Sequence, residues 1–112
     1  MSAFTEYNKF VLDHDADCQM IDITPRQAVI LAMAMLELHK QSNHGRVCFI
    51  LLLPDRSTLN ANDLDLLDLM TEDKPYLKWG DSEKHSFVIT NEGCKFINDN
   101  SVVFHQLIPE II

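Results

Sequence analysis

The densest group of side chains that could bind a partner is a run of carboxylates late in the first two thirds of the chain. It comprises Asp63, Asp65, Asp68, Glu72 and Asp73, and no lysine or arginine interrupts it before Lys74. An exposed carboxylate repels a phosphate group and cannot replace a counterion on a nucleic acid. The run therefore favours a protein partner, and we predict that these five residues contact it.

Side chains that could act as nucleophiles or metal ligands have weaker contexts. Cys94 lies near a predicted helix N-terminus, a setting that can lower the pKa of a thiol, but a position facing the core is the simpler interpretation. Two histidine–cysteine pairs have a spacing of four, His14–Cys18 and His44–Cys48. Their histidines fall in predicted loops, where this spacing does not bring side chains together. The sequence also lacks a glycine-rich phosphate loop, GxSxG and HExxH. We predict no catalytic residue, no metal site and no cofactor.

Calcium is the metal with the best spacing. Asp13, Asp15 and Asp17 reproduce the first three ligand positions of an EF-hand loop, although Cys18 replaces the required glycine and Thr24 replaces the closing glutamate. In the segment 81–92 the ends fit instead, but the centre is typical of a strand. A solvated acidic loop at 13–17 is the simpler interpretation, and a degenerate EF-hand-like calcium-binding protein is kept as the second alternative function.

The bulk composition agrees with a protein partner. The 112 residues include 17 acidic and 9 basic side chains, which give a formal net charge of −8 and a field that repels polyanions. The length is typical of one domain, so we treat 1–112 as a single domain. Three cysteines without a CxxC spacing indicate free thiols in a reducing compartment. No leader pattern is apparent, and the longest apolar run, 47–53, is far short of the ~20 residues of a membrane span. We therefore predict a cytoplasmic protein.

The elements that must position these residues begin with helices. Apolar spacing predicts an N-terminal helix over 3–12. The stretch Thr24-Pro25-Arg26-Gln27 is typical of a capping box with proline at the first helical position. It predicts a central buried helix that ends by about Ser42. The apolar run 47–53 fits a buried strand or two turns of buried helix, and its pattern does not decide between them.

The second half of the chain predicts a helix, a hairpin and another helix. The helix spans about 61–72, with Asn60 as its cap and Leu64, Leu67 and Met70 as its apolar face. Two short β-rich segments, 76–79 and 86–89, flank a turn-like stretch, 80–84, and predict the hairpin. Thr90 then caps a helix that extends to about Asn98. The apolar tail 102–112 should dock on the body or on another chain, which predicts a homodimer as one outcome.

This order of elements resembles the winged helix-turn-helix family. The resemblance covers about 24–98 and is carried mainly by 75–96, where the strands around Gly80-Asp81-Ser82-Glu83-Lys84 would be the wing and Val88-Ile89-Thr90-Asn91-Glu92-Gly93 resembles the junction after it. It implies an α+β fold: a small winged-helix-like domain, mainly helical, with a β-hairpin wing. A strand at 47–53 would leave the helix-turn-helix one helix short.

The resemblance also implies that the helix before the wing enters the major groove of DNA, which requires basic or amide side chains. Here that helix carries the carboxylate run instead. We therefore predict a non-enzymatic, acidic protein-interaction module that acts as a regulator or inhibitor. Phages and mobile elements often encode small acidic proteins of this type, and imitation of DNA is one way in which they act.

Two further expectations concern partners. The first alternative function is a DNA-binding winged-helix transcriptional regulator, in which dimerisation gathers Lys78, Lys84 and Arg46 into a basic strip. Trp79 lies beside Gly80 at a predicted turn, where an exposed aromatic side chain would anchor a protein partner. Packing of Trp79 under the wing is the competing interpretation, and both stay open from the sequence.

Overall fold

The computed structural model describes residues 16–40, 42–49, 58–105 and 107–108. The helices are α2 (Pro25–Lys40), α3 (Leu64–Asp68), α4 (Asn91–Asp99) and α5 (Ser101–Phe104), with a 3-10 turn η1 (Ser42–Gly45), and the strands are β1 (Val47–Cys48), β2 (Leu77–Trp79) and β3 (Ser86–Ile89). Residues 16–20 are also helical. The predicted helix 3–12, the aspartates Asp13 and Asp15, and residues 50–53 of the apolar run lie outside the described residues. The elements form an α+β domain.

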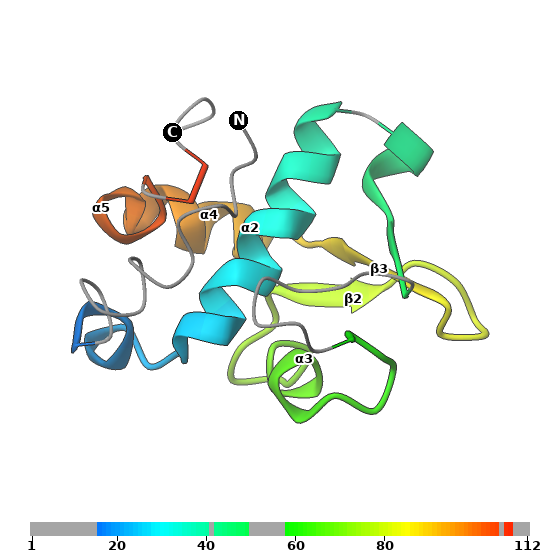
Figure 1. Ribbon diagram of the computed structural model, residues 1–112, viewed down its shortest axis with the longest axis horizontal. Coiled ribbons are helices and arrows are strands. Elements are labelled where there is room, and N and C mark those ends of the chain that lie inside the picture. Colours follow the sequence, from blue (N-terminus) through cyan, green and yellow to red (C-terminus); the bar gives the residue numbers. More distant parts are fainter. Residues whose placement is uncertain (1–15, 41, 50–57, 106, 109–112) are drawn as a thin grey trace.

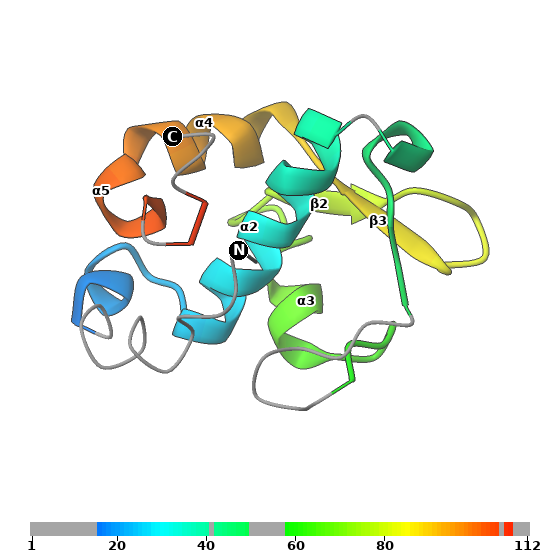
Figure 2. The same cartoon turned by 45° about the horizontal axis from the view of Figure 1, so that its top comes forward.

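The capping box at the start of α2 is confirmed. The Thr24 hydroxyl accepts a hydrogen bond from the Gln27 amide at 3.0 Å, and Gln27 Oε1 accepts one from the Thr24 amide at 2.9 Å. The helix runs for 16 residues and is buried continuously from Gln27 to Met35. It crosses the middle of the molecule, with α4 and α5 on one side and α3 and the hairpin on the other (Figures 1 and 2).

The predicted hairpin is also confirmed. β2 and β3 pair antiparallel, with Leu77 opposite Ile89, and β1 adds to the other edge of β3, with Val47 opposite Phe87. The strand order is therefore β1-β3-β2. Val47 and Cys48 belong to a strand, which answers the open question for the first two residues of the apolar run.

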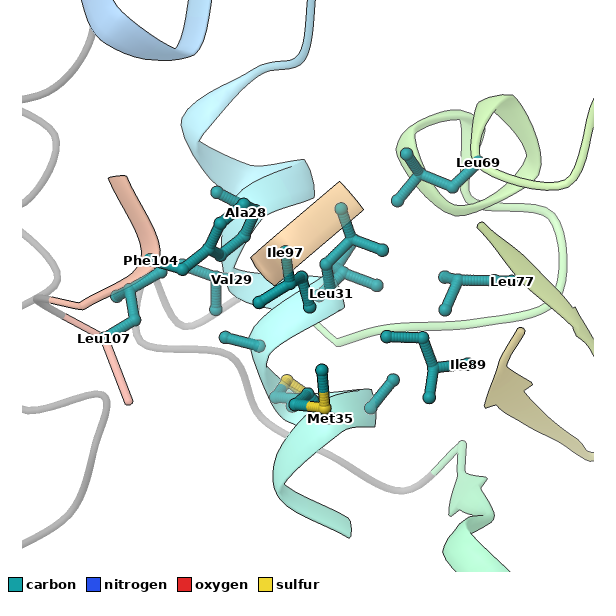
Figure 3. Close-up of a cluster of buried hydrophobic side chains, with 14 of the residues drawn as sticks. Ala28, Val29, Leu31, Met35, Leu69, Leu77, Ile89, Ile97, Phe104 and Leu107 are labelled. Carbon is teal, nitrogen blue, oxygen red and sulfur yellow. The ribbon is translucent and has the colours of Figure 1, made fainter. Parts of the chain in front are cut away.

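The core is built on α2. Figure 3 shows α2 side chains such as Val29 and Leu31 between Phe104 and Leu107 on one side and Leu77 and Ile89 on the other. From the apolar tail, Val103, Phe104, Leu107 and Ile108 are all buried. The described part of the tail thus docks on its own body, as one of its two predicted outcomes required. Val102 is the exception, at 80% exposed.

The second predicted helix is much shorter than the predicted span 61–72. The side chain of Asn60 accepts a hydrogen bond from the Asn62 amide at 2.9 Å and forms a turn, so Asp63 is the helix cap instead. Beyond Leu69 the chain leaves the helix, because Met70 pairs with Pro75 in an isolated bridge. The helix that carries the carboxylate run is therefore α3, only five residues long.

The buried face of α3 also differs from the prediction. Leu66 and Leu69 are fully buried, whereas Leu64 is 81% and Leu67 is 36% exposed. The segment has leucines on both faces, and tertiary packing selects the pair that contacts α2.

The predicted acidic loop 13–17 needs a correction as well. Asp17 belongs to the helical segment 16–20, in which Cys18 is fully buried. The buried Cys18 side chain packs this helical segment against the core. None of the helices in the described part of the chain has both the length and the apolar character that crossing a membrane requires.

The junction between the sheet and α4 depends on a glycine. The Thr90 hydroxyl accepts from the Gly93 amide at 3.0 Å and donates to the Pro75 carbonyl at 2.6 Å, which confirms the predicted cap. A Cβ on Gly93 would overlap the carbonyl oxygen of Tyr76 and lie 2.7 Å from Ile89 Cγ1. Because a backbone carbonyl cannot turn away as a side chain can, only glycine fits here.

We therefore expect Gly93→Ala to lower the free energy of unfolding by about 1–3 kcal/mol, as overpacked sites do. Urea unfolding monitored by circular dichroism measures the change. Asn91→Ala, an exposed substitution in the same first turn, is the control and should change stability by less than about 0.5 kcal/mol. Equal midpoints for Gly93→Ala and the wild type would contradict the close approach.

Candidate functional site

The carboxylates of α3 are held against the start of α2. Arg26 Nη1 lies 2.6 Å from Asp63 Oδ1, and Nη2 lies 2.6 Å from Asp63 Oδ2, so the guanidinium and the carboxylate meet as two parallel hydrogen bonds. Nη1 also donates to Asp65 Oδ2 at 3.2 Å. Arg26 and Asp63 are only 18% and 12% exposed. The two helices lie side by side at this point (Figure 1).

Asp63 has a second role as the cap of α3. Its Oδ1 accepts hydrogen bonds from the amides of Asp65 at 3.1 Å and Leu66 at 3.4 Å. Burial raises the pKa of Asp63, but the hydrogen bonds and charge of Arg26 and these amides outweigh it, so the pKa lies below its ordinary value. The hydrogen bond to Asp63 likewise raises the pKa of Arg26. The pair is therefore charged across the usual pH range.

A second set of contacts holds the end of α3. Gln27 Nε2 donates to Asp68 Oδ2 at 2.9 Å and to the Asp65 carbonyl at 3.2 Å. Lys74 Nζ lies 3.2 Å from Asp68 Oδ2 and 3.4 Å from Asp22 Oδ2. Hydrogen bonds from Gln27 and then Lys74 lower the pKa of Asp68. Burial lowers the pKa of Lys74, but Asp68 and Asp22 more than compensate and raise it.

An open groove of about 670 Å³ lies between the start of α2 and α3. It is lined by Gln19, Asp22, Ile23, Thr24, Gln27, Leu64, Asp65, Leu67, Asp68, Thr71 and Lys74. Of the described residues, three carboxylates and one ammonium group form its charged lining. The exposed leucines of α3, Leu64 and Leu67, belong to the same lining. The groove thus combines apolar surface with an excess of negative charge.

The structure divides the five carboxylates predicted to bind a partner into three groups. Asp65 and Asp68 line the groove. Asp63 does not line it, but it pairs with Arg26 and so holds α3 against α2. Glu72 and Asp73 are exposed beyond the end of α3 and do not line it.

Trp79 is separate from the groove. It is half-buried at the end of β2, with its ring edge-on to Phe49 at 5.8 Å and the Lys84 ammonium 5.7 Å from its centroid. This geometry matches the packing interpretation of Trp79 more closely than that of an exposed anchor.

The sequence does not assign a partner-binding role to the groove residues Asp22, Gln27 and Lys74 or to their neighbour Arg26. Arg26 and Gln27 were read only as parts of a capping box, and Asp22 and Lys74 were not assigned a role. Arg26 and Asp63 are 37 positions apart, and no local pattern connects such a pair. Leu64 and Leu67 are exposed because the opposite face of α3 packs into the core. Local sequence does not determine which face does so.

The remaining candidates for chemistry lie elsewhere. None of the three cysteines forms a disulfide bond, as predicted. Burial raises the pKa of Cys94, the direction opposite to that of an activated thiolate. His44 and Cys48 are both exposed, and Cys18 is buried.

The hairpin tip holds the closest group of metal-ligand types among the described residues, Asp81, Glu83 and His85, with ligand atoms within 4.8 Å of one another. Asp81 Oδ1 accepts hydrogen bonds from the amides of His85 and Ser86. Burial raises the pKa of Asp81, but the hydrogen bonds from these amides outweigh burial. The pKa of Asp81 therefore lies below its ordinary value. Asp81 therefore shapes the turn, while Glu83 and His85 are about three-quarters exposed, at 74% and 75%. Since the segment 86–89 is strand β3 and α4 follows, the segment 81–92 is not a continuous calcium loop.

Comparison of the chain with protein-family models, with curated protein sequences and with solved structures finds no significant match. The function must therefore be inferred from the groove and its chemistry.

We expect Arg26 and Asp63 to be energetically coupled. Arg26→Met leaves a partly buried carboxylate without its main partner and should lower the free energy of unfolding by about 1–3 kcal/mol. Asp63→Asn keeps a capping side chain but removes the charge. In a double-mutant cycle measured by urea unfolding, the double variant should lose less stability than the two single variants together.

The exposed pair Lys95–Asp99, 3.2 Å apart on α4, is the matched control. Its coupling should be below about 1 kcal/mol, since solvent screens exposed pairs. Strict additivity at Arg26 and Asp63 would show that the two side chains do not interact.

The lowered pKa values of Asp63 and Asp68 predict a dependence of stability on pH. A carboxylate whose pKa is lower in the folded protein contributes fully above its unfolded value of about 4, and this contribution is lost as pH falls through the folded value. Between about pH 6 and pH 3, the wild type should therefore lose more stability than Asp63→Asn/Asp68→Asn. Urea unfolding at each pH measures the two profiles. Parallel profiles for the wild type and the double variant would show that these two carboxylates do not cause the pH dependence.

Proposed function

We propose that this protein is a non-enzymatic interaction module that acts as a regulator or inhibitor by binding a protein partner in the groove between α2 and α3. The observation that carries the proposal is the lining of the groove, in which two exposed leucines lie among three carboxylates and one ammonium group. Exposed apolar side chains next to a polar rim are typical of protein-binding surfaces.

The groove is preorganised for such a partner. Asp65 and Asp68 are fixed by Arg26, Gln27 and Lys74, so little side-chain freedom is left to lose on binding. The pairing does not cancel the charge. Asp22, Asp63, Asp65 and Asp68 share only Arg26 and Lys74. Among the residues that the structure describes here, the carboxylates outnumber the cations by two, which disfavours DNA or RNA at this face.

The first alternative, a DNA-binding regulator of winged-helix form, has support at the hairpin. A Cβ on Gly80 would lie 3.3 Å from Arg46 Cγ, so the stem of Arg46 lies over Gly80. Lys84 lies over Trp79 in the same hairpin, and Lys78 is exposed on β2. Arg46 and Lys84 thus lie along the same hairpin as Lys78, and the carboxylates Asp81 and Glu83 lie at its tip.

Affinity purification from cell extract tests the two functions against each other. We expect Asp22→Lys/Asp68→Asn to reduce recovery of a protein partner about tenfold, a loss of about 1.4 kcal/mol, because it reverses the sign of the charge in the groove. The control Glu92→Lys changes an exposed carboxylate on α4 and should recover the same partner in the same amount.

Unchanged recovery by the groove variant would contradict the proposal. Recovery that disappears after nuclease treatment, together with a salt-dependent gel shift abolished by Arg46→Ala/Lys84→Ala, would support the DNA-binding alternative instead.

A further inference from the structure

The apolar side of the groove is formed by one face of a short helix. Leu64 and Leu67 are three positions apart, so they lie on the same side of α3. They point away from the core because Leu66 and Leu69, on the other side, are fully buried against it. Leu64 is the more exposed of the two, at 81%. The protein therefore presents a leucine pair at helical spacing to whatever occupies the groove.

The charged side offers acceptors that are only partly used. Both contacts of Asp68 go to Oδ2, from Gln27 and Lys74. Asp22 is 92% exposed, and Lys74 also reaches its Oδ2. Among the described residues, the Oδ1 atoms of Asp22 and Asp68 are thus left for a ligand on either side of Lys74. Carboxylates in this state favour lysine or arginine side chains.

We infer that the groove binds a cationic amphipathic helix of the partner protein, with an apolar stripe on Leu64 and Leu67 and with lysine or arginine side chains on Asp22 and Asp68. This inference rests on the proposed function and adds the chemistry of the partner. A leucine pair on successive turns packs best against side chains that recur at the same spacing, which is the helix-in-groove mode of recognition.

Two other occupants fit less well. A second copy of this chain also carries a net charge of −8, so its approach to an acidic groove is opposed by repulsion between like charges. A small anionic ligand meets the same repulsion from the carboxylates of the lining. A cationic segment instead gains from the local charge and from the long-range field of the whole protein.

The test uses the purified protein and a fluorescent peptide of leucine and lysine with the helical period of about 3.6 residues. One comparison peptide has the same composition in an order that disperses the leucines, and another has glutamate in place of lysine. Fluorescence anisotropy gives the dissociation constants. The periodic leucine–lysine peptide should bind at least about tenfold more tightly than either comparison peptide.

Matched variants locate the site. Leu64→Ala/Leu67→Ala should weaken binding of the periodic peptide about tenfold, whereas Val102→Ala, an equally exposed apolar side chain on α5, should not. Asp22→Asn/Asp68→Asn should weaken it by a similar factor and reduce its salt dependence, whereas Glu92→Gln should not. Leu64→Ala alone is the second variant if the double substitution changes thermal unfolding, because Leu64 makes the smaller contribution to the core.

Absence of binding, or equal binding of the periodic and dispersed peptides, would overturn the inference. Equal binding by wild type and groove variants would place the peptide elsewhere and overturn it as well. A self-association that sedimentation detects in the wild type but not in Leu64→Ala would make a second copy the occupant. The leucine variants could bind the periodic peptide as tightly as the wild type while recovery of the partner from extract still depends on Asp22 and Asp68. In that case the helix inference fails and the proposed function stands. If neither depends on the groove, both fail.

Discussion

The paired hydrogen bonds between Arg26 and Asp63 join the first turn of α2 to the first turn of α3. A helix of five residues has too few internal hydrogen bonds to be stable by itself. Asp63 compensates because the same carboxylate caps α3 and accepts from Arg26, while Leu66 and Leu69 anchor the helix in the core. These contacts together hold α3 against α2 and set which of its faces is exposed.

One consequence is a division of charge between the two sides of α3. Arg26 pairs with Asp63 and Asp65 next to α2, whereas the described lining of the groove keeps more carboxylates than cations. The same rotation of α3 that buries Leu66 turns Leu64 outward. The orientation of α3 therefore produces both the acidic and the apolar surface of the groove. This coupling connects the fold to the proposed binding of a cationic partner.

The elements that the sequence predicted well are those with local signals. The capping box at Thr24, the hairpin around Gly80 and the cap at Thr90 each depend on residues close together in the chain, and each is confirmed. The segment 64–69 was mispredicted because its leucines satisfy helical spacing on two faces at once. The predicted cap, Asn60, was wrong because Asp63 caps the helix instead, and Asp63 pairs with Arg26, 37 positions away. Two of the groove carboxylates, Asp65 and Asp68, were therefore found from the sequence, but Asp22, the cations and the exposure of the leucines were not.

Hydrogen exchange of the backbone amides tests most directly whether the contact with Arg26 holds α3 in place. In Arg26→Met, the amides of Leu66, Leu67 and Leu69 should exchange at least about tenfold faster than in the wild type, because α3 opens locally once its cap loses its partner. The amides of β3 and α4, which do not depend on this contact, should keep their rates. Unchanged exchange in α3, or an equal acceleration throughout the chain, would contradict this account of the site.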